Sequence, residues 1–252
     1  MEPILTLDHV SYSYHTKDGE TAALKDISFS VKPGSFISIV GPSGCGKSTL
    51  LSLISGLIMP EKGEIYMNGT PAIDARMHIG YMLQKDNLFE WRSVYRNVLL
   101  GLEMRKQCTP EKIELVDKMI SSYGLQEFRN SKPSQLSGGM RQRAALIRTL
   151  ALEPDILLLD EPFSALDYQT RLEVSDDIAR IIKEQGKTAI LVTHDLSEAI
   201  AMGEQVIVLS CRPGMIRDII DINLSIEDRT PFKSRTAKEF STYFNQIWKE
   251  LT

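Results

Sequence analysis

Residues 41–49 of the chain read Gly41-Pro42-Ser43-Gly44-Cys45-Gly46-Lys47-Ser48-Thr49. This stretch matches the pattern G-x-x-x-x-G-K-[ST], in which the backbone N–H groups of a glycine-rich loop converge on phosphate oxygens. An apolar run, FISIV at 36–40, precedes the loop, and the helix-like sequence KSTLLSLISGL follows it. A phosphate loop needs this order, because the N-terminus of the helix favours an anion. We therefore predict a nucleoside-triphosphate site to which all of 41–49 contributes, rather than a flexible glycine-serine turn that binds nothing.

Two side chains of the loop have specific predicted tasks. Lys47 neutralises charge on the β- and γ-phosphates, and the Ser48 hydroxyl is a ligand for Mg²⁺. A second apolar run, ILLLD at 156–160, ends in the carboxylate of Asp160. Open α/β sheets bind ligands at the carboxyl ends of their strands, and in P-loop enzymes the strand-end aspartate holds Mg²⁺. Asp160 is therefore a predicted metal ligand together with Ser48.

Glu161 follows this strand directly. Period-two alternation would point its side chain away from that of Asp160 if the strand continued. Glu161 can instead face a water positioned to attack the γ-phosphate, which makes it a candidate catalytic residue. The alternative is an acidic pair that only ends a strand, and the presence of a phosphate loop in the same chain disfavours it.

A serine and two glycines, Ser137-Gly138-Gly139, precede a helical run. Such a start leaves backbone N–H groups exposed at a helix N-terminus, which again suits an anion. The chain thus has two segments that favour phosphate. From this segment alone, an ordinary N-cap at Ser137 followed by flexible glycines is an equally good interpretation.

Strand-like and helix-like runs alternate along most of the chain. Strands are predicted within 4–40, at 64–69, where the segment ends in an Asn68-Gly69 turn, and at 79–83, 156–160, 188–193 and 205–210. Helices at 168–185 and 196–202 separate the last three strands. The alternation predicts an α/β fold with a largely parallel core sheet. Because 93–152 reads as mostly helical, the predicted domains are an α/β core of 1–92 and 153–224, a helical subdomain of 93–152, and a helical tail of 225–252.

The composition disfavours several classes of protein. The chain has 252 residues, 42% of them hydrophobic, so a large core is expected. A formal net charge of −4 gives no electrostatic footprint for nucleic acid, and no nucleic-acid partner is predicted. The three cysteines are far apart, which suggests neither a disulfide framework nor a zinc site and fits a reducing cytosol. The start, MEPILTLDHV, has no basic n-region, and no run approaches the ~18 apolar residues of a spanning helix, so the chain itself is expected to be soluble and not exported.

The segment LSGGM at 136–140, followed by RQR at 141–143, resembles the signature of ABC ATPases. Other motifs of that family occur in the expected order, namely an aromatic Tyr14, the phosphate loop, Gln84, the run SALD at 164–167, and His194. The resemblance covers roughly 5–224 and implies ATPase activity with ATP and Mg²⁺. It also implies the fold of a P-loop NTPase ABC cassette, in which the core sheet carries an antiparallel β subdomain and an inserted helical subdomain.

The resemblance gives these residues roles. Tyr14 would stack on adenine, Asp167 would belong to the D-loop, and His194 would hold the γ-phosphate and the attacking water. Gln84 would sense Mg²⁺ and the transmembrane partner, which places it with both the catalytic and the metal-side residues. In the family two copies close head to tail, so Ser137, Gly138 and Gly139 would serve the γ-phosphate bound by the partner copy. Without the resemblance, Tyr14 is an exposed hairpin end, Gln84 a loop amide and His194 a structural hydrogen-bonding residue.

Further stretches resemble the nitrate, sulfonate and taurine group of importer ATPases: QKDNLFEW at 84–91, ALDYQTR at 165–171, THDLSEAI at 193–200 and VLSCRPG at 208–214. This likeness implies a homodimeric subunit at the cytoplasmic face of the cell membrane, a separate transmembrane permease and, indirectly, an extracytoplasmic solute-binding protein. Phe89-Glu90 stands where the group more often has a leucine-proline pair, so a thiamine-precursor importer stays open beside one for a nitrate-, sulfonate- or taurine-like anion. An exporter ATPase is another alternative. A DNA-repair ABC ATPase is less favoured, because the span from Lys47 to Ser137 is too short for an inserted coiled coil.

Two apolar features lie outside these motifs. Phe89 and Trp91 fall in a predicted surface loop that suits docking to the permease, although burial of Trp91 in the core is an alternative. The tail carries an apolar stripe on one helical face, formed by Phe240, Phe244, Ile247 and Leu251. Packing against the domain is the favoured explanation of this stripe, and a regulatory or partner-docking helix is the other.

Overall fold

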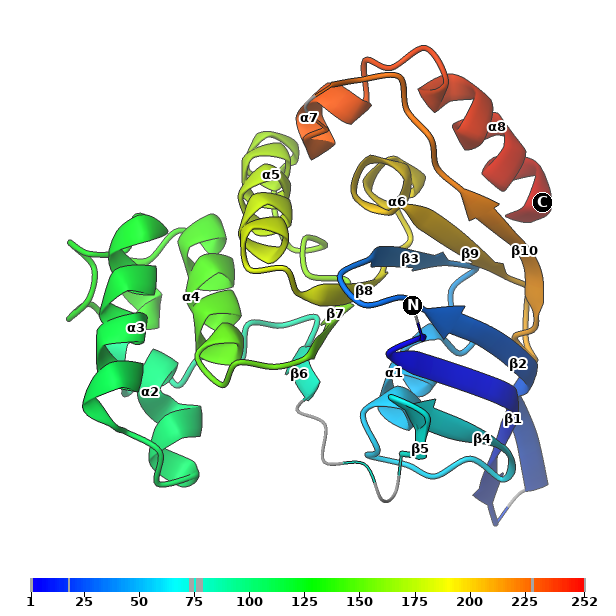
Figure 1. Ribbon diagram of the computed structural model, residues 1–252, viewed down its shortest axis with the longest axis horizontal. Coiled ribbons are helices and arrows are strands. Elements are labelled where there is room, and N and C mark those ends of the chain that lie inside the picture. The colour runs from blue at the N-terminus through cyan, green and yellow to red at the C-terminus, as the bar shows by residue number, and fades with distance from the viewer. Residues whose placement is uncertain (1, 18, 73–74, 76–78, 228, 252) are drawn as a thin grey trace.

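The computed structural model describes residues 2–17, 19–72, 75, 79–227 and 229–251. Its central layer is a six-stranded sheet in the order β10-β9-β3-β8-β7-β6 (Figure 1). The strands are β10 (Ile216–Asp221), β9 (Gln205–Leu209), β3 (Phe36–Val40), β8 (Thr188–Val192), β7 (Ile156–Asp160) and β6 (Ile79–Met82). Neighbours run parallel except β10, which is antiparallel to β9. The α/β fold and the largely parallel core sheet predicted from the alternation are confirmed.

Burial on both faces explains why the central strands are continuously apolar. Every residue of β3, β7 and β8 is buried. Along β7 the side chains alternate between two cores, since Leu157 and Leu159 pack with the helical region while Ile156 and Leu158 pack with the second sheet. Such a strand has no polar face, which is typical of parallel sheets that other layers cover on both sides.

The second sheet has four strands in the order β2-β1-β4-β5. They are β2 (Gly19–Val31), β1 (Leu5–Thr16), β4 (Lys62–Met67) and β5 (Thr70–Pro71), and all their pairings are antiparallel. The predicted turn at Asn68 and Gly69 joins β4 to β5, with φ values of 48° and 73°. Helix α1 (Lys47–Ile54) packs between the two sheets, because its Leu50, Leu51 and Ile54 share one core with both (Figure 1).

Helices α2 (Val94–Met104), α3 (Pro110–Ser122) and α4 (Gly138–Leu150) gather on one side of the molecule, away from the second sheet (Figure 1). A short 3-10 turn, Pro133–Gln135, precedes α4. Each of the three helices begins after a hydroxyl residue, Ser93, Thr109 or Ser137, whose side chain accepts a hydrogen bond from a backbone N–H of the first turn. The sequence therefore fixes these helix starts locally.

The remaining helices are α5 (Tyr168–Glu184), α6 (Leu196–Met202), α7 (Pro231–Ser234) and α8 (Phe240–Leu251). Helix α8 lies across α6 and the β9–β10 edge, with Ile247 fully buried and the other three residues of the tail stripe packed around the same cluster. Packing against the domain therefore explains that stripe. Strand β10 was not predicted, whereas α7 and α8 both fall within the predicted helical tail of 225–252. Among the residues described, we find no helix long and apolar enough to cross a membrane.

Candidate functional site

The phosphate loop joins β3 to α1, and its backbone requires glycine. Gly44 and Gly46 have φ values of 76° and 105°, which side chains rarely allow. A Cβ on Gly46 would lie 2.9 Å from the Ala23 carbonyl oxygen and 2.7 Å from Leu24 Cδ2, so the packing also excludes one. No side chain caps the start of α1. Its first N–H groups are thus available to an anion.

Lys47 is held inside this loop. Its side chain is buried, and Nζ donates to the carbonyl oxygens of Gly41 at 2.8 Å and Pro42 at 3.0 Å. Both acceptors are neutral, so the hydrogen bonds orient the ammonium without neutralising it. A buried cation with neutral partners attracts a polyanion strongly, because charge is costly to leave uncompensated away from water.

Ser48 and Asp160 meet although they are far apart in sequence. Ser48 Oγ donates to Asp160 Oδ1 at 3.2 Å, and Tyr81 on β6 donates to Oδ2 at 3.4 Å. Burial, aided by the charge of Glu161, raises the pKa of the Asp160 carboxyl. Burial, together with the charge of Asp160, raises the pKa of Tyr81 to about 12, so the phenol keeps its proton and donates. A hydroxyl and a carboxylate side by side are hard oxygen ligands, which fit Mg²⁺.

Glu161 has a left-handed backbone, with φ of 45°, that ends β7 and turns its side chain. Its N–H still bonds to the Val192 carbonyl oxygen at 2.8 Å, which fixes it to β8. Its Oε2 lies 3.2 Å from His194 Nδ1 and accepts from Gln84 Nε2, also at 3.2 Å. The three residues predicted as catalytic thus converge from the ends of three neighbouring strands, β7, β8 and β6.

A cavity of about 320 Å³ opens above the loop. Glu161 and Tyr14 line it together with six residues of the phosphate loop and α1, namely Ser43, Gly44, Gly46, Lys47, Ser48 and Thr49. Gly41, Pro42 and Cys45, also predicted as contacts, do not line this cavity. Gly41 and Pro42 instead supply the carbonyls that hold Lys47, and Cys45 is buried behind the loop, where burial raises the pKa of its thiol.

Tyr14, which is predicted from the sequence to stack on adenine, lines this cavity. The Tyr14 hydroxyl lies 3.1 Å from Thr49 Oγ1, and the ring packs edge-on against Tyr12 with centroids 5.1 Å apart. These contacts hold the ring while 41% of the residue stays exposed. Through this hydroxyl contact, the Tyr14 side chain bridges β1 and α1.

The signature residues lie elsewhere. Ser137 caps α4 by accepting from the Met140 N–H at 3.3 Å, and neither it nor the two glycines that follow lines the cavity. A Cβ on Gly138 would lie 2.9 Å from Leu166, and one on Gly139 2.9 Å from Val174, so close packing also favours glycine here. Asp167 caps α5 through the Thr170 N–H at 3.0 Å, which lowers the pKa of its carboxyl. Within one chain, these four predicted residues are not brought to the phosphate loop.

A buried network supports the segment that carries His194. Thr193 Oγ1 donates to Glu198 Oε2 at 2.6 Å and accepts from the Asp195 N–H at 3.0 Å. Arg171 of α5 lies 3.7 Å from Glu198 Oε1 and 3.3 Å from Asp195 Oδ2. Burial raises the pKa of the Glu198 carboxyl. The network ties the strand end before His194 to the helix that follows Asp167.

A second network fixes the loop after Gln84. Arg141 of α4 contacts both oxygens of Asp86, at 2.8 and 3.3 Å, and reaches Glu90 at 2.8 Å. Arg148, about two turns further along α4, donates to the Asn87 and Asp86 carbonyl oxygens, each at 2.7 Å. The loop between Gln84 and Trp91 is therefore attached to the helix that Ser137 begins.

Sequence reasoning missed several residues of this site. Tyr81 falls in a predicted strand and Glu198 in a predicted helix, but neither residue has a predicted role in the site. Arg212 falls in the VLSCRPG stretch, which served only to show resemblance to the importer group. Arg212 lines the cavity beside Tyr14. Of these residues, only Tyr81 has a signal that could have placed it in the site, namely its position in a strand that pairs with β7. The register sets Tyr81 opposite Leu158, close to Asp160.

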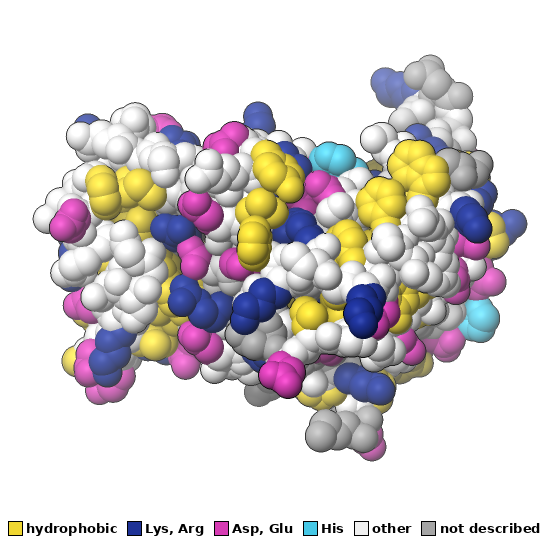
Figure 2. Space-filling model, turned by 90° about the horizontal axis from the view of Figure 1, so that it is seen from above, with side chains coloured by type: hydrophobic (Ala, Val, Ile, Leu, Met, Phe, Trp, Pro, Cys, Tyr) yellow, Lys and Arg dark blue, Asp and Glu magenta, His cyan; other side chains and the backbone are white. Residues whose placement is uncertain are grey.

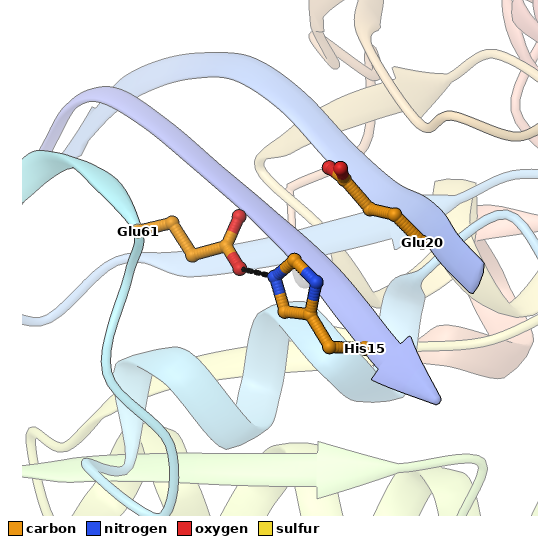
Figure 3. Close-up of side chains that lie close together, drawn as sticks. All are labelled: His15, Glu20 and Glu61. Carbon is orange, nitrogen blue, oxygen red and sulfur yellow. Dashed lines mark hydrogen bonds and ion pairs between the residues drawn. The ribbon is translucent and has the colours of Figure 1, made fainter. Parts of the chain in front are cut away.

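Among the residues that the structure describes, charged side chains outside this cavity give no reason to place a second site. On the face drawn in Figure 2, basic and acidic side chains are interspersed, and hydrophobic ones form separate small groups. His15, Glu20 and Glu61 lie near one another on the second sheet and its flanking loop (Figure 3). All three are exposed, and the contact among them is an ion pair of 2.5 Å between His15 Nε2 and Glu61 Oε1, which lowers the pKa of Glu61. Such an exposed pair needs no metal to explain it.

Comparison with known proteins agrees with this geometry. Residues 24–164 match the family model described as "ABC transporter". An uncharacterized ABC transporter ATP-binding protein of Bacillus subtilis, YtlC, is 47% identical over 98% of this chain and 95% of its own length. A taurine import ATP-binding protein of Pelagibacter ubique is 42% identical, with 98% and 97% covered. An aliphatic sulfonates import ATP-binding protein of Bacillus licheniformis is 38% identical, with 92% and 88% covered.

Solved structures extend the likeness to the whole fold. The dimeric structure of MJ0796, a bacterial ABC transporter cassette, superposes with a TM-score of 0.75 at 33% identity, covering 87% of this chain and 99% of that one. A dimeric post-hydrolysis state of the same cassette, bound to ADP and Pi, superposes with a TM-score of 0.73. Together with the phosphate loop and the carboxylates beside it, these matches show that the chain is an ATPase and belongs to the ABC transporter family as an ATP-binding subunit.

Proposed function

We propose that this chain energises an ABC importer by binding and hydrolysing MgATP between two copies of itself. The observation that carries the proposal is the convergence of Glu161, His194 and Gln84 beside a cavity lined by the phosphate loop. A carboxylate with an imidazole and an amide both within hydrogen-bond reach of it is suited to orienting an attacking water.

The proposed roles follow from the positions of these groups. The N–H groups at the start of α1 and the Lys47 ammonium bind the phosphate chain, and Tyr14 stacks on the base. Ser48 and Asp160 would hold Mg²⁺, which would neutralise charge on the phosphates when bound, and Gln84 would be a further residue on the metal side. Glu161 accepts a proton from the attacking water, while His194 holds Glu161 and the γ-phosphate in register.

A second copy completes the site. Ser137 and Gly138, at the start of α4, are exposed, yet they do not line the cavity of their own chain. A helix N-terminus attracts an anion only where one can approach, so a head-to-tail pair gives these N–H groups the partner's γ-phosphate. One solved relative, the cassette MJ0796, forms a dimer in two structures, which supports this arrangement.

The partner that spans the membrane is proposed to dock on Phe89 and Trp91. Their rings stack 4.7 Å apart, and Trp91 is 73% exposed. An apolar stack with this exposure needs a covering partner, and a cytoplasmic segment of a permease fits because relatives are named as import subunits. The chain would then sit at the cytoplasmic face of the membrane, with 93–152 as a helical subdomain that moves with the permease. A solute-binding protein would act on the far side.

The proposed solute is a small sulfonate-like anion such as taurine. The support is the likeness to taurine and aliphatic sulfonate import subunits over most of the chain. The ATPase subunit itself contacts no solute, so this assignment rests on kinship rather than on a pocket. Uptake by membranes that carry the whole transporter tests it directly.

The ATPase mechanism is tested with Glu161→Gln and Lys47→Ala. Glu161→Gln keeps the shape of the side chain but not its basicity, so MgATP binding should persist while turnover falls by about 10²–10⁴-fold. Lys47→Ala should abolish MgATP binding, because the buried cation is lost. Nucleotide titration and steady-state phosphate release separate the two effects. Parental turnover in Glu161→Gln would contradict the role of Glu161, and parental affinity in Lys47→Ala would contradict the site itself.

A further inference from the structure

The loop between β9 and β10, Ser210-Cys211-Arg212-Pro213-Gly214-Met215, is built rigidly. A backbone hydrogen bond closes the loop, in which the Ser210 N–H donates to the Met215 carbonyl oxygen at 2.8 Å. The Ser210 hydroxyl accepts from the Met215 N–H at 2.9 Å and donates to the Pro213 carbonyl oxygen at 3.1 Å. A loop with these internal bonds holds its side chains in fixed positions at little further entropic cost.

The same loop is fastened to the strand that flanks the phosphate loop. The Gly214 N–H donates to the Ala23 oxygen at 2.9 Å, and the Lys25 N–H donates to the Gly214 oxygen at 2.9 Å. Gly214 also lies against the phosphate loop, since a Cβ at this position would collide with the carbonyl oxygen of Cys45. The close approach is possible only for glycine and brings the residues before it to the edge of the nucleotide cavity.

Arg212 is the residue of this loop whose side chain lines the nucleotide cavity. Its Nε donates to the Ala22 carbonyl oxygen at 3.2 Å, and the side chain lines the cavity with Tyr14, Lys47 and Glu161. Within the described part of the chain, no carboxylate forms an ion pair with its guanidinium. Arg212 and Lys47 are thus the two basic side chains among the residues that line the cavity.

We propose that Arg212 is a further nucleotide-binding residue, whose guanidinium contacts the phosphate chain in the cavity that it lines with Lys47. The proposal rests on the nucleotide site proposed above. With Nε fixed by the Ala22 oxygen, the terminal nitrogens of the planar group are oriented and free to donate to an anion. Lys47 comes from the phosphate loop and Arg212 from the β9–β10 loop, so two separate segments each supply a cation to the cavity.

The test measures MgATP, ADP and GTP affinity of Arg212→Ala and Arg212→Lys in the full chain. A lost charge-assisted hydrogen bond corresponds to roughly tenfold weaker binding, which we expect for Arg212→Ala with all three nucleotides. Arg212→Lys should recover part of the affinity, because it restores charge without the forked geometry. Raising the salt concentration should weaken binding less in Arg212→Ala than in the parent.

Two controls separate this inference from its premises. Arg217→Ala removes the same charge from β10, where the side chain donates to the Glu250 oxygen and does not line the cavity, so its affinity should match the parent. Lys47→Ala reports on the site itself: if that variant binds nucleotide normally, the proposed function fails. If Lys47→Ala loses binding while Arg212→Ala stays within twofold of the parent, only the role of Arg212 is overturned. A loss confined to ATP and ADP and absent for GTP would also overturn it, since the contact would then be with the base.

Discussion

At the scale of single residues, the backbone of Glu161 decides what the strand end can do. An extended conformation would place this carboxylate on the face opposite Asp160, in the core that Leu157 and Leu159 share. Its φ of 45° stops the strand instead and directs the side chain to His194 and Gln84. A left-handed residue other than glycine costs about 1–2 kcal/mol, which the bond from its N–H to the Val192 oxygen helps to offset. Local strain at this position therefore serves the proposed chemistry.

Glu198 gives a residue-scale prediction about pH. Because burial raises the pKa of Glu198 above its ordinary 4.5, the folded chain holds this proton more tightly than the unfolded chain does. Its contribution to stability is present below pH 4.5 and is lost as pH rises through the raised value. Glu198→Gln can still accept the Thr193 hydroxyl but does not titrate. Relative to the parent, its free energy of unfolding should therefore increase from pH 5 to pH 8 in urea titrations.

The matched control for this experiment is Glu103→Gln. Glu103 is paired with Arg92 and Arg96, whose hydrogen bonds lower the pKa of its carboxyl, so the sign of its effect is opposite. Its stabilising contribution is present above the ordinary value and is lost only as pH falls below it. Between pH 5 and pH 8 the difference between this variant and the parent should stay constant. A constant difference for Glu198→Gln as well would refute the assignment.

At the scale of elements, the loop from Gln84 to Trp91 joins the proposed catalytic centre to the proposed docking surface. Its first residue contacts Glu161, and its last presents the exposed ring stack. Between them, Arg141 and Arg148 attach the loop to α4, and Asn97 of α2 accepts from the Phe89 N–H at 2.7 Å. A displacement of α4 therefore moves the loop with it, because the contacts are several and charge-assisted.

Replacing Phe89 and Trp91 with serine tests the docking surface. ATP affinity of the isolated subunit should change by less than twofold, because neither ring lines the cavity. Copurification with the permease and solute uptake should both be lost, since an exposed aromatic stack is the kind of anchor that dominates interface energy. Phe232→Ser, at an exposed position of α7, is the control and should leave both unchanged. Normal uptake by the double variant would show that the permease docks elsewhere.

The elements that could be predicted from the sequence are those whose signal is local. Residues 36–49 and 156–160 each combine an apolar run with a chemical motif. Strand β3, the phosphate loop after it and strand β7 therefore follow from the pattern. Strand β10 could not be predicted, because IRDIID at 216–221 mixes charged and apolar residues at a sheet edge. Arg212 and Glu198 could not be assigned to the site either. Their relevance depends on contacts with β2 and α5, which only the tertiary fold creates.

At the scale of the whole molecule, the two helix starts that are proposed to bind phosphate lie on different parts of the fold. The start of α1 lies in the core between the sheets, whereas the start of α4 belongs to the group of helices beside it (Figure 1). One chain cannot use both on the same phosphate, since Ser137 and its neighbours do not line the cavity. The proposed two-fold pairing would resolve this geometry, because each copy would then supply the half that the other lacks.

The arrangement of lesions in a dimer tests this pairing. Heterodimers purified through two different tags can carry Lys47→Ala on one copy and Ser137→Arg on the other, which places both lesions in one composite site and leaves the second intact. Pairing a Lys47→Ala/Ser137→Arg double variant with a parental copy uses the same two substitutions but damages both sites. Each dimer loses one α4 cap, worth about 1 kcal/mol, so stability is matched between them. We expect phosphate release from the first dimer to be several times that of the second, because only the first keeps a complete site. Equal rates in the two arrangements, or full activity of the Ser137→Arg homodimer, would mean that the signature of one copy does not serve the nucleotide of the other.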